Sequence, residues 1–122
     1  FGKEHSITVP YDPEFYRTKA HYSNLYWGCS LKALYLLAER KGYVFVGSNS
    51  SGNNAYFIRK DKIGFLKTYT VEQGYVESRF RESRDVNRKL TFVSGGSRLD
   101  AIKEMPVFDL EKDSIIKIKE LF

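Results

Sequence analysis

The chain has 122 residues, of which 42% are hydrophobic and 16% aromatic; this excludes a disordered chain and predicts a single domain or domain fragment over residues 1–122. One cysteine, Cys29, excludes an internal disulfide and a cysteine-rich zinc site, so we expect a reducing, cytoplasmic setting. The net charge of +5 suits an anionic partner, but basic residues alternate with acidic ones, which argues against nucleic acid.

The sequence contains no pattern typical of membrane insertion. The longest apolar run, ALYLLA at 33–38, is far short of the roughly 20 residues of a membrane-spanning helix. No signal-peptide pattern comes before it. We therefore expect no membrane partner.

The first predicted elements are short. Ile7 and Val9 alternate with polar residues and predict a strand fragment that Pro10 ends, because proline cannot donate to a ladder. Asp12 as a cap and Pro13 at the first helical position then predict the start of a short helix.

The strongest helix pattern lies at residues 30–42. Ser30 can cap its N-terminus, Gly42 can end it, and one stripe carries Leu31, Leu34, Tyr35 and Ala38. Leu36 and Leu37 widen this stripe, which predicts that the helix packs against a sheet.

Residues 43–46 and 55–58 are rich in β-branched and aromatic side chains and predict an antiparallel hairpin. The loop between them, GSNSSGNN, holds only turn formers, and we expect its tip to be mobile and exposed. Gly47 and Gly52 have the spacing of a phosphate-binding loop, but asparagines stand where that loop needs Lys and Ser or Thr.

The second half of the chain predicts smaller elements. In residues 77–89, five basic residues alternate with three acidic ones, typical of the solvated face of a helix. A short strand at 90–93 and a Gly-Gly turn come next, and then a helix capped by Ser97 that stops at Pro106. Ile116 and Ile118 alternate with lysines and predict a strand that pairs with residues 107–110.

Few residues suggest chemistry. His5, His21 and Cys29 do not have the spacing of metal ligands, so we expect no metal site. His21 lies among tyrosines and is either a general base or a half-buried ring bonded to the backbone. Cys29 is either activated by the following helix N-terminus or simply a buried thiol. The catalytic residues remain unknown.

Several stretches resemble the C-terminal part of FkbM-like, class I S-adenosylmethionine-dependent methyltransferase-related bacterial proteins, many of them encoded among surface-polysaccharide genes. These stretches are VPYDPEF, HYSNLYWGCSLKAL, KGYVFVGSNSSGNNAYFIRKD, FRESRD and LTFVSGGSRLDAIKEMPV. The resemblance implies an α/β fold, the C-terminal portion of a Rossmann-like methyltransferase sheet in which a helix precedes an antiparallel hairpin. A small C-terminal helix and hairpin would extend it.

The resemblance also implies how the function is divided along a longer protein. S-adenosylmethionine would bind to the N-terminal half of such a parent protein, so no residue here is expected to bind a cofactor, and the isolated chain is expected to be inactive. We expect a C-terminal fragment or an excised domain. Its uncovered strand edge and apolar helix face would favour homo-oligomers.

The resemblance places YDPEF and HYSNLYWG near the catalytic edge of the sheet, where ligands of open α/β folds bind. The candidate contacts to a polar acceptor such as a sugar are Tyr11, Asp12, His21, Tyr22 and Asn24. The alternative is that Asp12 caps a helix and the tyrosines pack in a core. The competing function is a stand-alone basic and aromatic module that binds an anionic partner.

Overall fold

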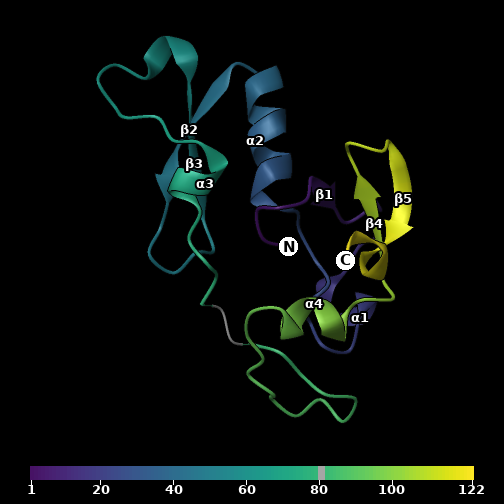
Figure 1. The fold of residues 1–122 in the computed structure, drawn as a ribbon. Coiled ribbons are helices and arrows are strands. Elements are labelled where there is room, and N and C mark those ends of the chain that lie inside the picture. The colour runs from purple at the N-terminus through teal and green to yellow at the C-terminus, as the bar shows by residue number, and fades with distance from the viewer. Residues whose placement is uncertain (80–81) are drawn as a thin grey trace. The chain divides into compact units, whose positions relative to one another are not determined.

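The computed structural model describes residues 1–79 and 82–122 and has a mixed α/β fold with antiparallel sheets and a few short helices (Figure 1). Contacts divide the chain into two compact units. Unit 1 comprises Phe1–Ser6 and Ser30–Phe80, and unit 2 comprises Ile7–Cys29 and Arg81–Phe122. Each unit therefore combines two segments that are distant in sequence.

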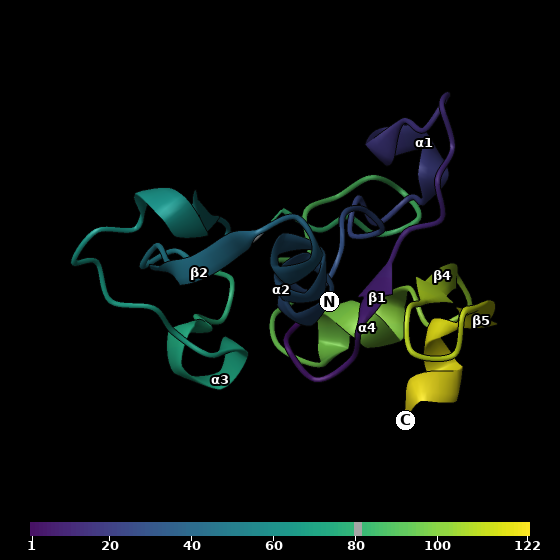
Figure 2. The same ribbon diagram turned by 90° about the horizontal axis from the view of Figure 1, so that it is seen from above.

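In unit 1, helix α2 (Leu31–Arg40) is followed by strands β2 (Tyr43–Ser48) and β3 (Ala55–Arg59), which confirms the predicted helix and antiparallel hairpin. Ser30 caps the helix, because its Oγ accepts the N–H of Ala33 at 3.1 Å. Gly42 adopts the left-handed conformation, φ +78°, that ends many helices. The helix lies beside the hairpin in both views (Figures 1 and 2).

The core of unit 1 is built around Phe45. Its ring lies 6.4 Å from that of Tyr35, edge to face, and 5.2 Å from that of Phe57. Leu31 of α2 and Val71 of the short helix α3 (Val71–Gly74) are buried with it. The expected packing of α2 against a sheet is confirmed.

The loop of the hairpin is held by specific bonds. The side-chain oxygen of Asn49 accepts the N–H groups of Asn53 and Asn54, both at 3.2 Å. The carbonyl of Ser51 accepts the N–H of Arg79 at 2.8 Å. The tip is exposed at Ser50, Ser51 and Asn53, as predicted, but the loop is attached to a neighbouring segment of the same unit, a contact that its turn-rich composition does not reveal.

Unit 2 contains a three-stranded antiparallel sheet in the order β1-β4-β5, formed by β1 (Ile7–Thr8), β4 (Pro106–Asp109) and β5 (Ser114–Lys117). Ile7, Val107 and Ile118 are almost fully buried. The predicted strand fragment near Ile7 and the C-terminal hairpin are both confirmed.

Two predicted helix starts are wrong. The residues at Asp12 and Pro13 form a turn, in which the Asp12 carboxylate accepts the N–H of Glu14 at 2.9 Å, and helix α1 begins only at Arg17 (Arg17–Ala20). Helix α4 (Ser97–Ala101) has Gly96 as its N-cap, with αR backbone angles and no side-chain capping bond, because glycine has no side chain to accept one. Ser97 is therefore the first helical residue.

The segment before α4 also differs from expectation. The predicted strand at 90–93 is reduced to a single bridge between Arg84 and Leu90. Ser83 explains the difference, because its Oγ accepts the N–H of Val93 at 2.9 Å and pairs with the hydroxyl of Thr91 at 2.8 Å. Of the charged run at 77–89, the described residues 77–79 and 82–89 contain no helix; Arg81 lies outside the described residues.

Candidate functional site

Unit 2 contains a groove of about 740 Å³, within the size range of ligand sites. We call it the unit 2 groove. Its walls come from α1, from the turns that follow it and from the segment 82–88, and the lining residues are Thr18, Lys19, Tyr22, Asn24, Glu82, Arg84, Val86 and Arg88.

Asn24 organises one wall of this groove. It is buried and has a left-handed backbone, φ +59°, which asparagine tolerates better than most residues. Its side-chain amide donates to Glu82 at 3.1 Å, and its carbonyl accepts from Nε of Arg17 at 2.9 Å. A second bond from Arg17 to Glu82, 3.3 Å long, closes the ring of contacts.

Glu82 is the acidic centre of this network. The hydrogen bond from Asn24, and then the positive charges of Arg17 and Arg84, hold the pKa of its carboxyl below the ordinary value, although desolvation opposes the shift. The carboxylate is therefore ionised at neutral pH, and its oxygens are occupied by neighbouring side chains of the chain itself.

The groove is lined by one carboxylate, Glu82, and by three cationic side chains, those of Lys19, Arg84 and Arg88. Arg84 lies 3.5 Å from Glu82 and donates to the carbonyl of Arg88 at 2.8 Å, so its guanidinium is fixed in place. The excess of positive charge makes the groove attractive to an anionic group of a ligand. Arginine is well suited to hold phosphate or carboxylate, because its planar fork donates two parallel bonds.

Tyr22 adds an aromatic wall. Its side chain is about half exposed, and its ring lies 4.3 Å from the ring of His21. Nδ1 of His21 accepts the N–H of Ser23 at 3.2 Å and lies 2.7 Å from its hydroxyl. Burial lowers the pKa of His21, which favours the neutral ring. The ring of His21 therefore packs against the ring of Tyr22, and the bonds between His21 and Ser23 fix the turn.

Comparisons with protein-family models, with curated proteins and with solved structures found no match to this chain. The argument for function therefore depends on the geometry of the site.

The structure separates the five candidate residues into two groups. Tyr22 and Asn24 line the unit 2 groove and His21 contacts Tyr22. Tyr11 is 92% exposed, and the carboxylate of Asp12 is used in its own turn; neither lines the groove. The alternative function of Asp12 as a helix cap is wrong, because no helix begins there.

Sequence reasoning missed the charged half of the groove, namely Lys19, Glu82, Arg84 and Arg88. Their alternating signs were interpreted as ion pairs along the face of a helix. In the structure Lys19 belongs to α1, whereas Glu82, Arg84 and Arg88 belong to irregular backbone, and Glu82 bonds to Asn24, a residue 58 positions away. The available signal was the excess of basic over acidic residues in 77–89, five against three.

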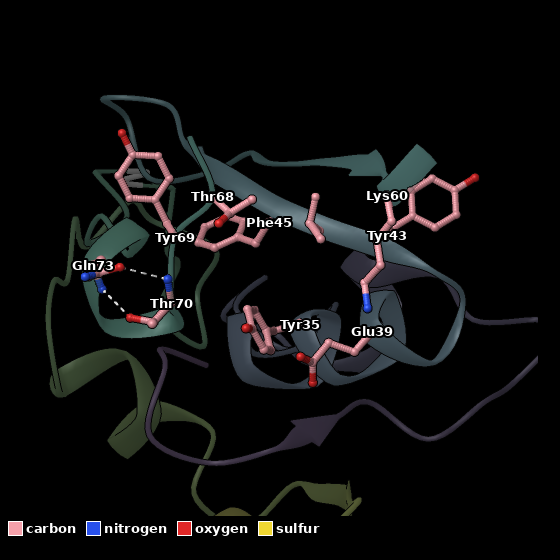
Figure 3. Close-up of a pocket in the computed structure, with 10 residues that line it drawn as sticks. Tyr35, Glu39, Tyr43, Phe45, Lys60, Thr68, Tyr69, Thr70 and Gln73 are labelled. Carbon is pink, nitrogen blue, oxygen red and sulfur yellow. Dashed lines mark hydrogen bonds between the residues drawn. The ribbon is translucent and has the colours of Figure 1, made fainter. Parts of the chain in front are cut away.

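Unit 1 contains a smaller pocket of about 210 Å³ between α2, β2 and the segment 68–73 (Figure 3). Tyr35 and Glu39 of α2 face Tyr69 and Lys60 across it, and Phe45 forms its floor. Thr70 and Gln73, which cap α3 by reciprocal bonds of 3.1 and 3.2 Å, close one end. This pocket is below the usual size of ligand sites, so we give priority to the unit 2 groove.

Other kinds of site find little support in the described residues. Within residues 1–79 and 82–122, no three His, Cys, Asp or Glu side chains are grouped closely enough to hold a metal ion. Burial raises the pKa of the Cys29 thiol, which disfavours the reactive thiolate. In the same described part of the chain, no helix has both the length and the hydrophobicity needed to cross a bilayer.

Proposed function

We propose that the chain is the acceptor-side C-terminal region of a methyltransferase-like cytoplasmic protein and that the unit 2 groove binds a polar acceptor with an anionic group, such as an acidic or phosphorylated sugar. The observation that carries the proposal is the combination of Tyr22 with Lys19, Arg84 and Arg88 in one groove. The aromatic ring can stack on the apolar face of a sugar, and the cations can bind its anionic group.

The methyltransferase part of the proposal is supported by unit 1, where α2 leads into the antiparallel hairpin β2–β3. In this proposal the hairpin is the C-terminal portion of a Rossmann-like sheet whose other strands lie in a longer protein. The acceptor would be a component of surface-polysaccharide synthesis.

S-adenosylmethionine does not fit the glycine-framed loop of this chain. A Cβ atom at Gly52 would come within 2.5 Å of the carbonyl oxygens of Val76 and Glu77. This glycine therefore admits the chain's own backbone rather than a ligand. We derive no step through the cofactor, which in this proposal is held by a different part of a longer protein.

The groove's charge also favours a second function, a stand-alone module that binds anionic partners. The two functions differ in what the ligand must contain. If the groove is an acceptor site, a ligand needs both the sugar ring and the anionic group, because Tyr22 can bind only the ring. A simple anion-binding module responds to the anion alone.

Titration of the chain with glucose 6-phosphate, inorganic phosphate and glucose, followed by NMR, tests this. We expect binding in that order of strength. Arg88→Gln should weaken binding of the sugar phosphate about ten-fold, because a charge-assisted hydrogen bond is lost. The side chain of Arg88 has no bond within the described residues, so this variant should fold normally.

The matched control is Arg40→Gln, which removes an exposed arginine from the last turn of α2 in unit 1 and should leave binding unchanged. Equal affinity for phosphate and glucose 6-phosphate would favour the anion-binding module. If neither ligand shifts the signals of Tyr22 and Asn24, the groove is not the binding site and the proposal fails.

A further inference from the structure

A loop of unit 1 carries an exposed apolar tip. It connects β3 to α3, and both views show it extending away from α2 and the hairpin (Figures 1 and 2). Phe65 is fully exposed, at 110%, and Leu66 is 58% exposed. A turn fixes this tip, because the N–H of Leu66 donates to the carbonyl of Ile63 at 3.2 Å and Gly64 has φ +57°. We call residues 59–67 the docking loop.

Basic residues flank the apolar tip on both sides. Lys60 and Lys62 come before it and Lys67 follows it, all exposed. The only acidic residue of the loop, Asp61, is held by Arg59 through bonds of 3.1 and 2.7 Å, so these two charges neutralise each other. Lys62 and Lys67 therefore flank the apolar tip with no carboxylate partner among the described residues, whereas the amine of Lys60 points into the unit 1 pocket toward Glu39 (Figure 3).

We propose that the docking loop binds the surface of an anionic lipid bilayer, with Phe65 and Leu66 entering the headgroup region and Lys62 and Lys67 contacting anionic headgroups. Phe65 and Leu66 are adjacent and both exposed, so together they form an apolar patch, and contiguous apolar patches mark interaction or membrane sites. An anionic membrane has hydrocarbon inside and negative charge at its surface. The apolar tip suits the hydrocarbon, and the flanking lysines suit the negative charge.

The shape of the loop favours a bilayer over a protein partner. The tip protrudes, so a protein partner would need a cavity preformed for Phe65, whereas a fluid lipid surface admits the ring at any point. The sequence predicted no membrane partner because it lacks a spanning segment, but surface binding needs none. This inference is independent of the unit 2 groove.

Sedimentation of the 122-residue chain with vesicles tests the proposal. One set of vesicles contains phosphatidylcholine alone, and the other contains equal parts of phosphatidylcholine and phosphatidylglycerol. We expect binding to the anionic vesicles only, and weaker binding at high salt because salt screens the lysines. A chain that stays in the supernatant with both kinds of vesicle would overturn the proposal.

Two pairs of variants separate the contributions. Phe65→Ala combined with Leu66→Ala should lower binding at least about ten-fold, because the apolar area no longer leaves water. Lys62→Gln combined with Lys67→Gln should lower it about five-fold for each lysine. The controls are Phe92→Ala, for an exposed ring of unit 2, and Lys89→Gln combined with Lys103→Gln; both should bind as the unchanged chain does.

Insertion of the tip has its own readout. Phe65→Trp should give an additional emission that shifts to the blue on anionic vesicles and is quenched by brominated lipid. Phe92→Trp should give neither effect. If the alanine and glutamine variants of the docking loop bind as strongly as the controls, or if the tryptophan at position 65 stays in water, the loop is not the membrane contact and the proposal is wrong.

Discussion

Gly74 occupies a position in α3 where no side chain fits. A Cβ atom there would overlap the ring of Phe45, the centre of the unit 1 core. Alanine normally favours a helix over glycine by about 1 kcal/mol, but the overlap forces either the ring or the helix to move. The steric cost is the larger effect.

We therefore predict that Gly74→Ala lowers the free energy of unfolding by about 1 to 3 kcal/mol, as overpacked cores do. Urea denaturation measures it. Gly96→Ala is the control, because a Cβ at Gly96 meets nothing within 4 Å and its backbone is already αR; a change within about 1 kcal/mol is expected. Equal effects of the two substitutions would contradict the packing around Phe45.

The residues of the groove show how far sequence reasoning reaches at this scale. Tyr22 and Asn24 could be selected in advance because the family resemblance places the stretch HYSNLYWG near the edge of the sheet where ligands bind. Their partners could not. Glu82 and Arg84 meet them only through a contact across 58 residues, and no local pattern encodes a contact of that range.

At the scale of elements, two serines make a direct comparison. Ser30 caps α2 through its Oγ, whereas Ser97 makes no capping bond in α4. Ser30→Ala should lower the free energy of unfolding by about 1 kcal/mol, because an N–H of the first turn loses its acceptor. Ser97→Ala should change it by less than about 0.5 kcal/mol.

Thermal or urea unfolding of the two serine variants, compared with the unchanged chain, measures both effects. A large loss of stability for Ser97→Ala would restore the capping function that the sequence suggested for it. No loss for Ser30→Ala would mean that the N-terminus of α2 is satisfied by other bonds.

These two helices also explain which elements are predictable. For α2, the cap, the apolar stripe and the terminating glycine all lie within 13 residues and agree with one another. The segment from 90 to 97 has no such agreement. Its backbone bonds to Ser83, eight to ten residues earlier, and this replaces the strand that its β-branched residues favour.

At the scale of the whole molecule, we predict that the chain self-associates at high concentration. Leu34 and Leu37 are 37% and 49% exposed on neighbouring turns of α2, so together they form an apolar patch. Light scattering should give a mass above that of the monomer. Leu37→Gln should bring it closer to the monomer.

The control for this prediction is Ile115→Gln, which removes a similarly exposed side chain from β5. It should leave the scattered mass unchanged. A monomer at every concentration would contradict the prediction and would mean that the exposed face of α2 is too small to hold two copies together.

The division into two units has a consequence for how the chain is made on the ribosome. The first segment of unit 2, Ile7–Cys29, is synthesised before the 51 residues of Ser30–Phe80, which belong to unit 1. At about 5 to 20 residues per second, it waits about 3 to 10 seconds before the second segment of unit 2 begins and about 4 to 16 seconds for strand β4. During this delay the aromatic side chains of the nascent segment lack their native neighbours, so this stretch is where we expect chaperones to act on the growing chain.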